Sequence, residues 1–125
     1  MSRTAHLRLP FFGAEHRAFA EDLDQWASQA AGDLEKSDAA HDVDTSCTRW
    51  VRALGAAGWL RYCVPAGHGG AYDPLQSLYL VIARETLARH SGLADFAFTM
   101  QGLGSAPISL SGSNELKTHY LPRVA

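Results

Sequence analysis

The spacing of apolar residues between positions 11 and 36 constrains the fold of this chain most. Apolar side chains recur there at steps of three, four and seven residues, which places them on one face of an α-helix. They are Phe12, Phe19, Leu23, Trp26, Ala30 and Leu34. The pattern therefore predicts a long amphipathic helix from Phe11 to about Lys36, whose apolar face needs a partner.

A second helix is predicted after an acidic stretch. Asp44 or Thr45 can accept a hydrogen bond from the first free amide groups of this helix. Gly58 is placed to end it, because glycine readily adopts the left-handed conformation found at helix C-termini. The apolar side chains that we expect it to carry inward are Cys47, Trp50, Val51 and Leu54.

A glycine-rich stretch, AGHGGAY at residues 66–72, follows the second helix. It lacks the Gly-Lys-Ser/Thr ending of a phosphate-binding loop, and no strand pattern precedes it as a dinucleotide fingerprint requires. Glycine permits backbone angles that other residues avoid. We therefore interpret the stretch as a tight turn between helices.

A third helix is predicted from Asp73 and Pro74, an N-cap followed by proline at the first helical position. Glu85 and Arg89 are four residues apart and can pair on its surface, and Gly92 can cap its end. Because its apolar residues point in nearly every direction, we expect this helix to be central and covered on most sides.

The remaining sequence predicts further helices and no strands. A fourth helix runs from Leu93 to about Gly102, Pro107 forces a fresh start, and Ser113 caps a last helix through Tyr120. The fourth helix carries Phe96, Phe98, Met100 and Leu103 among few polar groups. Since no alternating strand pattern or hairpin turn occurs, the predicted class is all-α with about six helices.

The composition is that of a globular protein, because 46% of the residues are hydrophobic and 19% are charged. The formal net charge of -2 provides no positive surface for nucleic acid or an anionic membrane. No apolar stretch approaches the roughly 20 residues of a membrane span, and the first residues lack the apolar region of a signal peptide. We expect a soluble, cytoplasmic protein with no nucleic-acid partner and no membrane span.

Patterns typical of catalytic or metal-binding residues do not occur. The sequence has no G-x-S-x-G motif, and no two of its six histidines are four residues apart. A zinc site from Cys47, Cys63, His41 and His68 would need an untypical spacing, so we interpret both cysteines as reduced, packed thiols. The residues alone predict no catalytic group and no metal site.

Three stretches after the opening helix occur in an order typical of one family. They are LGAAGWLRYCVPAGHGG, YLVIARETLARHSGLA and LGSAPISLSGSNELKTHYLPRVA. Together they resemble the N-terminal helical domain of acyl-CoA dehydrogenases, whose members carry V-P-x-x-x-G-G, E-x-L-A-R and G-x-x-x-x-K-x-x-Y-L-P. Two residues depart from the family pattern: His68 stands where tyrosine is most frequent, and Leu116 stands where glutamine usually precedes the lysine.

The resemblance implies that residues 1–125 form an orthogonal bundle whose fourth helix provides one wall of an acyl pocket. Candidate substrate-binding residues are Phe96, Thr99, Met100 and Leu103. The implied reaction is the α,β-dehydrogenation of an acyl-CoA, with FAD held in a β-domain and a glutamate base in a C-terminal helical domain. Both domains are absent from this sequence, so the chain alone is expected to hold no FAD and to be inactive.

The resemblance also implies partners: the acyl-CoA substrate, the remaining domains or a partner subunit, and further copies of the chain in a homo-oligomer. Two alternatives stay open. The chain could be a non-catalytic helical subunit or interaction module that pairs with a separate flavoprotein. It could instead belong to a flavin monooxygenase, since such enzymes share this fold.

Overall fold

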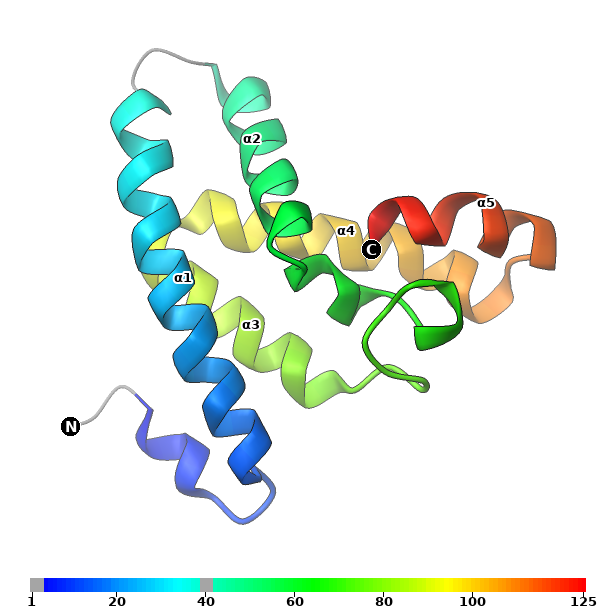
Figure 1. Cartoon of the computed structure of the whole chain (residues 1–125), viewed down its shortest axis with the longest axis horizontal. Coiled ribbons are helices and arrows are strands. Elements are labelled where there is room, and N and C mark those ends of the chain that lie inside the picture. Colours follow the sequence, from blue (N-terminus) through cyan, green and yellow to red (C-terminus); the bar gives the residue numbers. More distant parts are fainter. Residues whose placement is uncertain (1–3, 39–41) are drawn as a thin grey trace.

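A computed structural model describes residues 4–38 and 42–125, and their regular structure is helical (Figure 1). The α-helices are α1 Ala14–Asp38, α2 Val43–Ala56, α3 Ser77–His90, α4 Gly92–Ser111 and α5 Asn114–Val124. Short 3-10 helices are η1 Ala5–Arg8, η2 Trp59–Cys63 and η3 Ala66–His68. The described residues form no strand, only an isolated bridge between Pro65 and Tyr72. The predicted all-α class is confirmed.

The helix α4 crosses α1 and α2 rather than running parallel to them. In Figure 1, α1 and α2 lie side by side, and α4 passes across both of them at a steep angle. The helix α3 packs against α1 and α4, α2 packs against α4, and α5 folds back along the second half of α4. This arrangement agrees with an orthogonal bundle in which α4 contacts several other helices.

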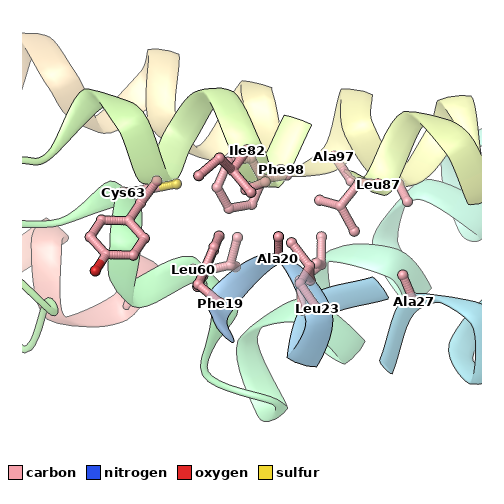
Figure 2. Packing of buried hydrophobic residues seen from close by; sticks show 14 of the residues in the cluster. Phe19, Ala20, Leu23, Ala27, Leu60, Cys63, Ile82, Leu87, Ala97 and Phe98 are labelled. Carbon is pink, nitrogen blue, oxygen red and sulfur yellow. The ribbon is translucent and has the colours of Figure 1, made fainter. Parts of the chain in front are cut away.

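The core lies between α1 on one side and α3 and α4 on the other (Figure 2). Leu23, Trp50, Leu54 and Leu87 are completely buried. Burying an aliphatic side chain of this size stabilises a fold by roughly 1.5–3 kcal/mol. The inward positions predicted for the first two helices are therefore confirmed at Leu23, Trp50 and Leu54, while Cys47 and Val51 are only half-buried.

A cluster of aromatic rings joins η2 to α1 and α3. The ring of Phe19 lies 5.6 Å from Trp59, 4.6 Å from Tyr62 and 5.0 Å from Tyr79, measured between centroids. Tyr79 also stacks on Tyr72, and their hydroxyl oxygens are 3.2 Å apart. These contacts hold the segment between α2 and α3 against the core.

Two predicted helix starts are displaced by a few residues. The first helix begins at Ala14 rather than Phe11, because the Gly13 carbonyl accepts its first hydrogen bond, from the Arg17 amide at 3.4 Å. The second is capped by Asp42, whose side chain accepts a hydrogen bond from the Thr45 amide at 2.9 Å. It ends as predicted near Gly58, which has a φ of 82°.

The third helix begins at Ser77 and not at Pro74. The Asp73–Pro74 peptide bond is cis, and the preceding residues are tied back by a hydrogen bond from the Ala66 amide to the Tyr72 carbonyl. The predicted pairing of Glu85 with Arg89 is present at 3.4 Å. The helix is not covered on most sides, because it packs mainly against α1 and α4 and leaves Val81 57% exposed.

The fourth helix is longer than predicted. Ser91 both ends α3 and caps α4, so Gly92 is the first residue of α4 rather than the C-cap of α3. Pro107 lies inside α4 and does not start a new helix. Because Pro107 is exposed, the Leu103 carbonyl that loses its amide partner lies on a face open to water. The last helix likewise continues through Pro122.

Candidate functional site

The four predicted substrate-binding residues lie on one side of α4. Phe96, Met100 and Leu103 follow the i, i+4, i+7 spacing of a single helix face and are 53%, 46% and 62% exposed. Thr99 lies at the edge of this face and is half-buried. The helix therefore presents a stripe of apolar side chains with one hydroxyl beside it. We call Phe96, Thr99, Met100 and Leu103 the α4 face.

The opposite side of α4 fixes this face in position. Ala97 and Phe98 point into the core (Figure 2) and are buried. Ser105 is also buried, and its hydroxyl oxygen lies 3.3 Å from the Cys63 carbonyl oxygen and 3.3 Å from that of Gly102. Since the Ser105–Cys63 contact is buried at both ends, it joins η2 to the inner side of α4 and leaves the α4 face pointing outward.

One charged pair borders the α4 face. Arg84 on α3 donates two hydrogen bonds to Asp95 on α4, at 2.9 and 3.0 Å. The Thr99 hydroxyl donates to the same carboxylate at 3.2 Å. The hydrogen bond and charge of Asp95 raise the pKa of Arg84. The Asp95 carboxylate is therefore engaged with Arg84 and Thr99.

The structure adds apolar side chains that the sequence prediction missed. Leu110 is 80% exposed and continues the stripe by a further seven residues along α4. The seven-residue step from Leu103 was a usable signal, but the expected break at Pro107 hid it. Val81, on the neighbouring α3, is also exposed, although that helix was expected to be covered on most sides. The exposed apolar surface is therefore larger than the four predicted residues.

Four successive amides of the glycine-rich turn donate to backbone carbonyls and are not free to bind a phosphate. The amides of His68 and Gly70 donate to the Pro65 carbonyl, that of Gly69 donates to Ala66, and that of Ala71 donates to Arg61. A bound pyrophosphate would need unpaired amides of this kind. The interpretation as a tight turn is confirmed, and this turn does not fit the pyrophosphate of FAD.

Hollows on the α1 side of the molecule lie away from the α4 face. One cavity of about 250 Å³ lies between η1 and α1 and includes Arg8, Arg17 and Asp24. Another of about 470 Å³ lies between α1 and α2 beside Trp26. Neither includes a residue of the α4 face. The predicted residues therefore form an open surface and not the lining of either cavity.

Buried titratable groups in the core keep their protons at neutral pH. Burial raises the pKa of the Cys63 thiol to about 12, and it also raises the pKa of the Tyr62 phenol. Burial and the hydrogen bond with Tyr72 raise the pKa of Tyr79. Cys63 is therefore a packed thiol and not an activated nucleophile.

Over residues 4–38 and 42–125, no three His, Cys, Asp or Glu side chains are grouped closely enough to hold a metal ion. His41, a member of the zinc set considered above, lies outside the described residues. In the same part of the chain, every helix is too short or too polar to cross a lipid bilayer.

Comparison with known proteins assigns the family. The family model described as "Acyl-CoA dehydrogenase, N-terminal domain" matches residues 13–125. No individually curated protein matches the chain. The matched range contains all five α-helices and the α4 face, and it begins just before α1. The chain therefore belongs to the acyl-CoA dehydrogenase family and contains its N-terminal helical domain.

Proposed function

We propose that this chain supplies one wall of the acyl-binding pocket of an FAD-dependent acyl-CoA dehydrogenase. Phe96, Thr99, Met100 and Leu103 would contact the acyl chain. The observation that carries the proposal is an outward-facing apolar stripe on α4, held by a buried helix side, in a member of this family. Covering such side chains with a hydrocarbon is favourable by roughly 25 cal/mol for each Å² of apolar surface removed from water.

In this proposal residues 1–125 act as one helical domain, and the flavin and the catalytic base come from other domains or a partner subunit. Two observations support this division. The amides of His68, Gly69, Gly70 and Ala71 already donate to backbone carbonyls, and Asp95, the acid beside the α4 face, is paired with Arg84. The described residues would then position the acyl-CoA and exclude water. The flavin and the catalytic base, held elsewhere in a homo-oligomer, would carry out the α,β-dehydrogenation.

Enlarging Thr99 tests the pocket assignment in the assembled flavoenzyme. Thr99→Trp should obstruct long acyl chains and spare short ones, because the indole ring of tryptophan would occupy the space that the distal carbons of a long acyl chain need. A single methylene in an apolar pocket is worth roughly 1–3 kcal/mol, so the ratio of kcat/KM for short over long acyl-CoA should rise at least about tenfold. Steady-state rates over a series of chain lengths, with flavin content measured for each enzyme, provide the comparison.

Thr118→Trp is the matched control, because Thr118 is an exposed threonine on α5 outside the α4 face. It should leave chain-length selectivity unchanged. Equal losses for all chain lengths in Thr99→Trp would contradict the pocket assignment. If a partner flavoprotein shows its full activity without this chain, and the chain adds no acyl-CoA turnover, a non-catalytic helical subunit would be favoured. Turnover that needs oxygen and reduced flavin would favour a monooxygenase.

A further inference from the structure

The hydroxyl of Thr99 is fixed in one hydrogen-bonding role. Its oxygen lies 3.2 Å from Oδ1 of Asp95. The same carboxylate accepts hydrogen bonds from Nε and Nη2 of Arg84 at 2.9 and 3.0 Å, one on each of its two oxygens. The Thr99 hydroxyl must therefore donate to Asp95. Arg84 on α3 prevents the carboxylate from turning away.

A donating hydroxyl has no second hydrogen, but it keeps two lone pairs. Within the described residues, no donor lies against the Thr99 oxygen. Its neighbours on the α4 face, Phe96 and Met100, have no hydrogen to donate. A ligand lying along this face therefore meets an apolar stripe interrupted by one hydrogen-bond acceptor of fixed orientation.

We propose that Thr99 is a specificity-determining residue that accepts a hydrogen bond from a hydroxyl group on the acyl chain, so that hydroxylated acyl-CoA thioesters are preferred substrates. This inference rests on the proposed function. A hydroxyl substituent can donate a hydrogen bond to the Thr99 oxygen. A keto oxygen has no hydrogen to donate, so its lone pairs would face those of Thr99. A plain hydrocarbon leaves the acceptor without a partner. Asp95 and Arg84 are positioning residues that act through Thr99.

The assembled enzyme tests the preference with pairs of acyl-CoA substrates of equal chain length that differ by a hydroxyl or a keto group. A net hydrogen bond changes a binding constant about three- to tenfold. The wild type should favour the hydroxyl over the plain chain by this factor. Thr99→Val, which keeps the shape, should abolish the preference, and Thr99→Ser should retain it. Asp95→Ala frees the Thr99 hydroxyl to donate to a keto oxygen, so the ratio of kcat/KM for hydroxyl over keto substrates should fall.

A matched control is Ser109→Ala, because the Ser109 hydroxyl lies on the same helix and bonds to the Ser105 carbonyl. It should leave all ratios unchanged. If Thr99→Val lowers kcat/KM equally for hydroxylated and plain substrates, the group that donates to Thr99 lies in the pantetheine part that both substrates share. This result would overturn the inference. Equal kcat/KM for the two substrates in the wild type would also overturn it.

A second experiment separates this inference from the proposed function by using the chain without flavin. The probes are 1-hexanol and dipropyl ether, which are isomers that differ in having a hydroxyl hydrogen. NMR titration should show tighter binding of 1-hexanol at the Thr99 methyl group, with the difference lost in Thr99→Val. If this holds while the assembled enzyme oxidises no acyl-CoA, the proposed function fails and the acceptor role stands. Equal shifts from both probes would overturn the acceptor role.

Discussion

Two glycines in the same turn are expected to respond oppositely to an added methyl group. A Cβ at Gly70 would overlap the backbone carbonyl of Val64, which belongs to a completely buried residue. Backbone cannot yield as a flexible side chain can, so Gly70→Ala should lower the free energy of unfolding by about 1–3 kcal/mol. Urea unfolding followed by circular dichroism measures this change.

Gly67→Ala is the control for this substitution. No atom lies within 4 Å of a Cβ placed at Gly67, and its φ is not positive. Alanine there restricts the unfolded chain, so stability should stay the same or rise by up to about 1 kcal/mol. Similar losses in both variants would contradict the open space around Gly67 and would indicate a turn that tolerates a side chain at neither glycine.

The helix α4 continues through Pro107, a residue that usually ends a helix, and replacing this proline should change the stability of the whole helix. Pro107 removes one hydrogen bond inside α4 and is exposed, so little packing depends on its ring. Pro107→Ala restores the donor to the Leu103 carbonyl and should raise the free energy of unfolding by about 1–3 kcal/mol. Thermal and urea unfolding provide the measurement.

Pro122→Ala should have a smaller effect, since Pro122 lies in the last turn of α5, where helix ends fray. A loss of stability in Pro107→Ala would show that the proline supports a bend on which the packing of α5 depends. Hydrogen exchange of the amides between Leu103 and Ser111 would then rise in the variant, whereas the expected outcome is slower exchange.

Helical periodicity was enough to predict much of the fold, because inward positions of an amphipathic helix follow from sequence spacing. Leu23 and Trp50 are examples, since each lies on a clear apolar stripe and is buried. Periodicity fails where a helix is apolar all round, as at Val81, because tertiary packing decides which side is covered. It also fails at Pro107, where an exposed position lets α4 continue past a residue that usually ends a helix.

The candidate site shows the same limit. The spacing of Phe96, Met100 and Leu103 predicts a shared face, and the structure places them together on α4. Spacing alone could not decide their exposure, because core packing is the commoner explanation of apolar residues at this spacing. The hydrogen bond that fixes Thr99 depends on Arg84 from another helix, so no local pattern could reveal it.

Among residues 4–38 and 42–125, large apolar side chains gather on the side of α4 that no other described element covers. Exposed there are Phe96, Met100, Leu103 and Leu110, and Val81 is exposed on the adjacent α3. Soluble monomers rarely leave apolar patches larger than a few hundred Å² in contact with water. A second copy of the chain packed on this side would remove this surface from water.

We therefore expect the chain, when it is alone in solution, to self-associate through this surface. Sedimentation in the micromolar range should show an apparent mass that rises with concentration, and a dye that binds apolar surface should fluoresce. Leu103→Glu combined with Leu110→Glu places two like charges on the stripe and should weaken association at least about tenfold. Val43→Glu is the control, because Val43 is 71% exposed at the start of α2, outside the stripe. A dye-silent monomer at every concentration, or equal weakening by the control, would show that the stripe is not the associating surface.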